Sequence, residues 1–276
     1  MEENNEILRV EGLCKSFIVE KSLSSKIRRF FTKEKPETVR ALNNVSFTVN
    51  AGEIVGILGE SGSGKSTLAR ALMGIHPADS GAAYLLGRDI CKASGAERLA
   101  ILRDMQMVFQ DPFGSLDPRM NIRQILSEPL KIHNITPQEG LETFLTNSLK
   151  EVGLGAEVLD RYPVEFSGGQ RQRIGICRAL ILNPKLIIAD EAVSALDVSV
   201  QAQILDLLIT LKQKRGLSMI FISHDVAVVR QISDRIILLY HGDIVEELPA
   251  DKLLTDAKHD YTKKLLKAAL SLREGK

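Results

Sequence analysis

The feature that most constrains this chain is a glycine-rich segment between an apolar run and a helical pattern, Gly59-Glu60-Ser61-Gly62-Ser63-Gly64-Lys65-Ser66. It satisfies the pattern G-x-x-x-x-G-K-[ST]. The preceding run, EIVGILG, is typical of a buried strand, and the following run, STLARALMG, has apolar residues at helical spacing. A strand, a glycine loop and a helix in this order predict a phosphate-binding loop. We expect Lys65 to reach the β- and γ-phosphates and Ser66 to place its hydroxyl on Mg²⁺.

The rest of the chain alternates between strand and helix patterns. Strand-like runs cover 105–110, 185–190 and 217–223, and a helical pattern lies between the last two. The run RIILLYHGDIVEEL at 235–248 predicts two strands joined by a hairpin. Strands alternating with helices predict an α/β fold, with a parallel sheet that has helices on both faces.

Composition narrows the class of protein further. The 276 residues carry 36 Lys and Arg against 35 Asp and Glu, a formal net charge of +1, so general nucleic-acid binding is disfavoured. Three widely spaced cysteines offer neither a disulfide framework nor a CxxC metal site. The first residues lack the layout of a signal peptide, and no apolar run approaches the roughly 20 residues of a spanning helix. We expect a protein of the reducing cytoplasm whose membrane partners are other chains.

A locally basic insertion, 21–40, separates two early strand-like runs. It has seven basic and two acidic residues and contains the pair Phe30 and Phe31. A solvated surface loop or short helix is one interpretation. Contact with lipid headgroups or a membrane partner is the other.

A carboxylate pair, Asp190 and Glu191, lies at the end of the strand-like run LIIAD. Ligands of parallel α/β sheets bind at the carboxyl ends of the strands. We expect Asp190 to hold Mg²⁺ through water, and Glu191 to act as the base that orients an attacking water. Alone, such a pair is commonly a helix cap, but downstream of a phosphate loop it predicts a hydrolytic site.

A second glycine motif, FSGGQRQR at 166–173, places Ser167, Gly168 and Gly169 at the head of a predicted helix. The start of a helix favours anions. Since one triphosphate already has its loop, this second site makes sense if it caps the γ-phosphate held by a facing subunit. The chain is therefore predicted to form a dimer with nucleotides sandwiched between two subunits.

Together these motifs resemble those of the ATP-binding cassette (ABC) family of transporter ATPases. The resemblance runs from about Leu8 to about Pro249. It implies an ABC-type ATPase domain at 6–250 with a RecA-like core, an N-terminal β subdomain and an inserted helical subdomain at about 112–183. Residues 251–276 would form a C-terminal helical tail.

The resemblance also implies roles for individual residues. Phe17 would stack on adenine, although a half-buried strand aromatic is an alternative interpretation. Gln110 would sense Mg²⁺ and the attacking water, His224 would contact the γ-phosphate, and Asp197 would cross the dimer interface. The residues expected to bind ATP are Phe17, Gly59, Glu60, Ser61, Gly62, Ser63, Gly64, Lys65, Ser66, Thr67, Ser167, Gly168, Gly169 and Gln170. Ser66, Gln110 and Asp190 are expected at Mg²⁺.

A narrower likeness, to the ATPases of oligopeptide, dipeptide and nickel importers, comes from QDPFGSLDPRM, the EFSGGQRQR block and the tail HDYTKKLL. Ala192 stands where such chains commonly have proline, which points toward the nickel branch. The implied partners are a second, similar but non-identical ATPase chain, two integral membrane permease subunits and an extracytoplasmic solute-binding protein. The expected location is the cytoplasmic face of the plasma membrane. Short peptides are the first expectation for the solute, nickel or a nickel chelate the second, and an exporter or a non-transport ATPase is less favoured.

Overall fold

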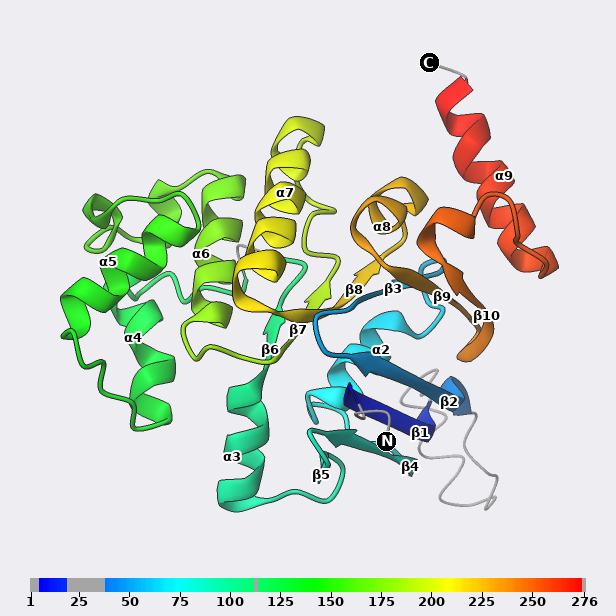
Figure 1. Ribbon diagram of the computed structural model, residues 1–276, viewed down its shortest axis with the longest axis horizontal. Coiled ribbons are helices and arrows are strands. Elements are labelled where there is room, and N and C mark those ends of the chain that lie inside the picture. Colours follow the sequence, from blue (N-terminus) through cyan, green and yellow to red (C-terminus); the bar gives the residue numbers. More distant parts are fainter. Residues whose placement is uncertain (1–4, 19–37, 112–113, 275–276) are drawn as a thin grey trace, which may run out of the picture.

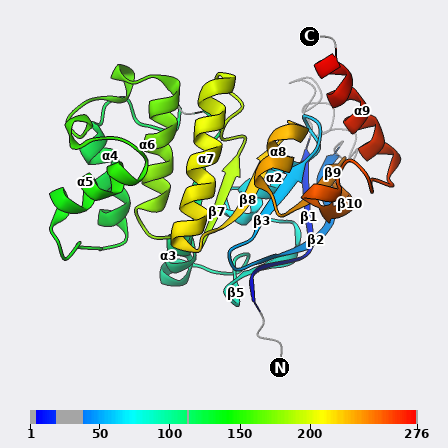
Figure 2. The same cartoon turned by 45° about the horizontal axis from the view of Figure 1, so that its top comes forward.

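The computed structural model describes residues 5–18, 38–111 and 114–274, with side chains described to Ala269. Most of the basic insertion therefore lies outside the described residues. The described part contains two sheets flanked by helices (Figures 1 and 2). Within it, none of the helices combines the length and apolar character that a membrane crossing needs.

The larger sheet has six strands in the order β10-β9-β3-β8-β7-β6. Neighbouring strands from β6 to β9 are parallel, and β10 pairs antiparallel with β9. The strands are β3 (Ile54–Leu58), β6 (Met105–Val108), β7 (Leu186–Asp190), β8 (Ser218–Ser223), β9 (Arg235–Tyr240) and β10 (Asp243–Pro249). The parallel sheet predicted from the apolar runs is thus confirmed.

The predicted hairpin joins β9 to β10 through His241 and Gly242. Both have positive φ, 48° and 88°. A two-residue turn with two positive φ values is the type that matches the twist of the flanking strands. This turn brings His241 to the same end of the sheet as the glycine loop.

The smaller sheet is antiparallel, in the order β2-β1-β4-β5. Its strands are β1 (Glu6–Ile18), β2 (Thr38–Asn50), β4 (Ser80–Leu85) and β5 (Arg88–Asp89). Together with α2 (Lys65–Leu72) it covers one face of the larger sheet (Figure 1). An N-terminal β subdomain is what the family resemblance implies for this part of the chain.

The opposite face of the larger sheet is covered by helices, among them α6 (Gly168–Leu180), α7 (Val198–Arg215) and α8 (Val226–Ile232) (Figures 1 and 2). Side chains of each strand alternate between the two sides, so that Ile187 packs in the helical core and Ile188 in the core shared with β1 and β2. The remaining helices of the described residues are α3 (Gly95–Asp104), α4 (Ile122–Ile132), α5 (Leu141–Glu151) and α9 (Asp260–Glu274), with 3-10 turns at Ala156–Val158, Pro163–Glu165 and Ala250–Lys252.

Candidate functional site

The glycine loop connects β3 directly to α2, as its sequence context predicted. Gly64 is the N-cap of α2 and has φ 110°, a conformation that L side chains rarely adopt. A side-chain carbon at Gly64 would lie 2.2 Å from the carbonyl oxygen of Ala41, and one at Gly59 2.3 Å from that of Leu239. Glycine at these two positions lets the loop pass close to β2 and β9.

The Lys65 side chain is folded back over this loop. Its Nζ donates to the carbonyl oxygens of Gly59 at 2.7 Å and Glu60 at 2.8 Å. The residue is 4% exposed, and burial lowers the pKa of Lys65, while the carboxylates of Glu191 and Asp190 oppose that shift. Lys65 is a buried ammonium held by neutral carbonyls, and among the described residues no carboxylate forms an ion pair with it. Such a group is poised to gain an anionic partner.

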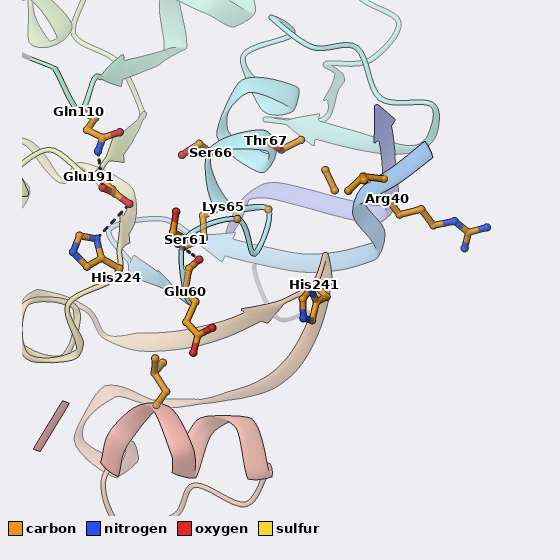
Figure 3. A pocket seen from close by; sticks show the side chains of 15 residues that line it. Arg40, Glu60, Ser61, Lys65, Ser66, Thr67, Gln110, Glu191, His224 and His241 are labelled. Atoms are coloured by element: carbon orange, nitrogen blue, oxygen red, sulfur yellow. Dashed lines mark hydrogen bonds and ion pairs between the residues drawn. The ribbon is translucent and has the colours of Figure 1, made fainter. Parts of the chain in front are cut away.

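A cavity of about 590 Å³ opens in front of the loop (Figure 3). Its lining comes from the glycine loop, the ends of neighbouring strands, the start of β2 and helix α9. The residues are Val39, Arg40, Ala41, Glu60, Ser61, Gly62, Gly64, Lys65, Ser66, Thr67, Gln110, Glu191, His224, His241 and Leu265. The cavity therefore unites the predicted phosphate loop with Gln110, Glu191 and His224, three residues distant in sequence.

At one end of this cavity, Glu191 lies between Gln110 and His224 and contacts both. Its carboxylate accepts a hydrogen bond from Gln110 Nε2 at 2.8 Å, and its other oxygen lies 3.4 Å from His224 Nδ1. Its φ is 48°, and its N–H donates to the carbonyl of Ile222 at 2.9 Å. An uncommon backbone conformation, fixed by a neighbouring strand, thus aims this carboxylate into the cavity (Figure 3).

Asp190 lies deeper than its neighbour, at the end of β7. It is 4% exposed, and its Oδ1 accepts a hydrogen bond from the Ser66 hydroxyl at 3.0 Å. Burial raises the pKa of Asp190, with a smaller contribution in the same direction from Glu191. A hydroxyl and a carboxylate oxygen side by side are the oxygen donors that Mg²⁺ takes in nucleotide sites.

The second glycine motif forms the start of α6, as predicted. Ser167 is the N-cap, and its hydroxyl accepts from the Gln170 N–H at 3.3 Å, while Gln170 Oε1 accepts from the Ser167 N–H at 3.1 Å. Neither these two residues nor Gly168 and Gly169 line the cavity of the phosphate loop. Within this one chain the two glycine motifs are therefore separate sites.

Phe17 lies in β1 opposite Val39, which lines the cavity, but Phe17 itself is not among the lining residues. Its ring packs edge-on against His76, with centroids 5.5 Å apart, and Lys15 Nζ lies 5.6 Å from the ring centre. The adenine-stacking role remains a prediction.

Sequence reasoning missed five lining residues: Val39, Arg40, Ala41, His241 and Leu265. The signals for two of them were present, because His241 is in the predicted hairpin turn and Leu265 belongs to the tail motif HDYTKKLL. Neither pattern says which cavity a side chain faces. Their place depends on β9 lying beside β3, which is a property of the sheet order.

The site combines a strand–glycine loop–helix unit, a carboxylate pair at the end of β7, two strands away in the sheet, and a second helix-start motif. This combination defines a phosphate-loop ATPase. The ABC transporter family model matches residues 42–194, more than half of the chain, and the chain belongs to that family. Its ATP hydrolysis is coupled to transport.

Two curated relatives are similar over nearly the whole chain. The oligopeptide transport ATP-binding protein OppF of Haemophilus influenzae is 48% identical over 95% of this chain and 77% of its own length. The probable peptide ABC transporter ATP-binding protein y4tS of Sinorhizobium fredii is 49% identical over 95% and 72%. Among solved structures, a dimeric post-hydrolysis ATP-binding cassette with ADP and phosphate has a TM-score of 0.74 and 28% identity, covering 88% of this chain and 98% of that one. The predicted family and fold class are confirmed.

Proposed function

We propose that this chain is the ATP-hydrolysing subunit of a bacterial importer of short peptides. The observation that carries the solute class is the likeness of 48–49% over 95% of the chain to two proteins named for peptide transport. Nickel, the alternative that Ala192 suggested, has no support among these relatives. The domain division proposed with this function is 6–250 for the ATPase, with helices from about 112 to 183, and 251–276 for the tail.

In this proposal ATP occupies the cavity at the glycine loop. The N–H groups at the start of α2 and the ammonium of Lys65 bind the β- and γ-phosphates. Ser66, Asp190 and Gln110 would hold Mg²⁺, which would supply positive charge to neutralise the triphosphate. The closeness of the Ser66 hydroxyl to the Asp190 carboxylate fits such a site.

Hydrolysis is assigned to the end of the cavity at Glu191. Its carboxylate accepts a proton from water as the water oxygen attacks the γ-phosphorus, and the bond to the bridging oxygen breaks to leave ADP and inorganic phosphate. Gln110 and His224, both within reach of Glu191, orient the water and contact the γ-phosphate. The different surroundings of the two carboxylates support different roles, Asp190 at Mg²⁺ and Glu191 at the attacking water. Asp190 is buried against Ser66, whereas Glu191 faces the cavity.

The proposed partners follow from the second glycine motif. Because Ser167 to Gln170 lie outside the cavity of their own chain, they would cap the γ-phosphate bound by a second, similar ATPase chain. Asp197, the N-cap of α7, would lie at the same interface. Two permease subunits and an extracytoplasmic solute-binding protein would complete the importer, with this chain peripheral on the cytoplasmic face of the membrane.

The test is peptide uptake by a deletion strain. We expect loss of uptake of labelled di- and oligopeptides, restored by the wild-type gene and not by the Glu191→Gln variant. Unchanged peptide uptake with loss of a nickel-dependent enzyme activity that excess metal rescues would overturn the peptide assignment. Intact uptake of both, with a drug or lipid accumulating inside the cells, would overturn import itself.

A further inference from the structure

Helix α9 is in direct contact with the phosphate loop. The backbone N–H of Glu60 donates a hydrogen bond to the Tyr261 hydroxyl at 2.9 Å, although the two residues are 201 positions apart. Tyr261 is 8% exposed, and its ring packs on that of Tyr240 with centroids 4.1 Å apart. In Figure 3, Glu60 extends from the loop toward the pale red helix α9.

This contact acts on the peptide group that also holds Lys65. The N–H of Glu60 and the carbonyl of Gly59 belong to one planar peptide unit, whose two polar atoms point in opposite directions. The carbonyl accepts from Lys65 Nζ at 2.7 Å, while the N–H donates to Tyr261. Tyr261 and Lys65 therefore hold opposite sides of the same peptide. Rotation of this peptide would move the carbonyl that fixes the ammonium.

Helix α9 is itself held firmly at its start. The Glu246 carboxylate in β10 accepts from the backbone N–H of Lys258 at 2.6 Å and, at 3.3 and 3.4 Å, from that of His259. Thr262 on the first turn is fully buried. Helix α9 is thus hydrogen-bonded both to β10, through Glu246, and to the phosphate loop, through Tyr261. These two attachments fix the rotation of the helix about its axis. That rotation places Leu265 in the cavity wall.

We propose that Tyr261 is a positioning residue for the phosphate loop, and that helix α9 is a structural part of the nucleotide site. Tyr261 fixes the Gly59–Glu60 peptide, and through its carbonyl the ammonium of Lys65. This inference rests on the proposed assignment of the glycine loop to ATP. In this proposal the tail motif HDYTKKLL contributes to nucleotide binding by holding the phosphate loop in place, and it takes no part in the hydrolysis step.

The test compares Tyr261→Phe with Tyr240→Phe in the full chain. Both variants keep an aromatic ring in the same stacked pair and lose one hydroxyl. Of these two hydroxyls, that of Tyr261 bonds to the phosphate loop. We expect Tyr261→Phe to weaken equilibrium binding of ATP and of ADP by about 3- to 10-fold, the effect of one lost hydrogen bond. Tyr240→Phe should retain the wild-type affinity. Melting temperatures without nucleotide are the control that both variants are folded.

Hydrogen exchange at the Glu60 amide supplies a readout that helix docking alone would not change. We expect faster exchange at this amide in Tyr261→Phe than in Tyr240→Phe. Wild-type ATP affinity in Tyr261→Phe, an equal loss in both variants, or unchanged exchange at Glu60 would each overturn the proposal. Lys65→Ala, measured alongside, distinguishes failure of the proposed ATP site from failure of the proposed role of Tyr261. If that variant binds ATP normally, the loop assignment itself is wrong; if it does not and Tyr261→Phe does, only the role of Tyr261 fails.

Discussion

The two glycine-containing helix starts of this chain differ in how their backbone donors are satisfied. The start of α2 has Gly64 as N-cap, and no side chain caps it, whereas the start of α6 is closed by reciprocal hydrogen bonds between Ser167 and Gln170. The first is open and faces a cavity with a buried Lys65. The second is self-capped and lies away from that cavity. Uncapped N–H groups must find partners, so the first start is ready for an anion within one chain.

The difference indicates a division of labour. At the start of α6 the Gln170 N–H is already capped, so an anion binds to that donor only when something brings the anion to it and offsets the lost cap. In a dimer, the facing subunit would supply the nucleotide. We therefore expect changes at the first start to act on a single chain, and changes at the second to act only on the pair.

The largest effect is expected from Glu191→Gln. This variant should keep two subunits together in a dimer, with the start of α2 of one subunit facing the start of α6 of the other. Removal of the general base should slow hydrolysis by about 10²- to 10⁴-fold, while the loop that binds ATP is left intact. ATP should then hold a stable dimer, measured by size with and without Mg-ATP, with the companion ATPase added if the chain does not pair with itself. Rapid hydrolysis by this variant would falsify Glu191 as the base.

Lys65→Ala tests the first helix start alone. Losing the ammonium removes charge-assisted hydrogen bonds to two phosphates, and we expect ATP affinity to fall about 100-fold, or roughly 3 kcal/mol. The measurement is equilibrium binding to the monomer, with circular dichroism as the control for folding. Unchanged affinity in a folded variant would remove the basis for the comparison, because the open helix start would not be the phosphate site.

Phe17→Ala tests whether the first site extends to the base. If the ring stacks on adenine, its loss should cost about 1 to 3 kcal/mol of ATP affinity and leave inorganic triphosphate binding unchanged. Binding of both ligands is measured with the same variant. A lower melting temperature with intact ATP affinity would favour the alternative, in which the contact of Phe17 with His76 serves packing.

The structural features of the site that could be predicted from sequence are those that short segments of the chain encode. Both helix starts, the strands before Lys65 and Glu191, and the hairpin at His241 follow from local patterns of glycine, apolar and charged residues. The alternation of strands and helices was enough for the parallel sheet. Helix α3 gave no such signal, because only Ile101 of its residues is buried and its apolar residues do not gather on one face.

Contacts between distant segments could not be predicted in this way. Leu265 and His241 reach the cavity because β9 lies beside β3 and because α9 packs near the loop, and neither fact is written in a local pattern. The conformation of Glu191 is of the same kind, since a neighbouring strand fixes its N–H. The tail motif was visible in sequence, but its contact with Glu60 required the fold.

The smallest effect is expected from Ser167→Ala, and it separates the two helix starts most directly. The substitution removes the cap that satisfies the Gln170 N–H, which should lower the free energy of unfolding by about 1 kcal/mol. In a monomer the nucleotide does not meet this residue, so ATP affinity should stay within about two-fold of wild type, in contrast to Lys65→Ala. ATP hydrolysis should fall, because it needs the assembled pair. Denaturant unfolding, monomer binding and hydrolysis measured on one preparation decide the matter: a loss of monomer ATP affinity equal to that of Lys65→Ala would mean that both helix starts serve a single nucleotide within one chain.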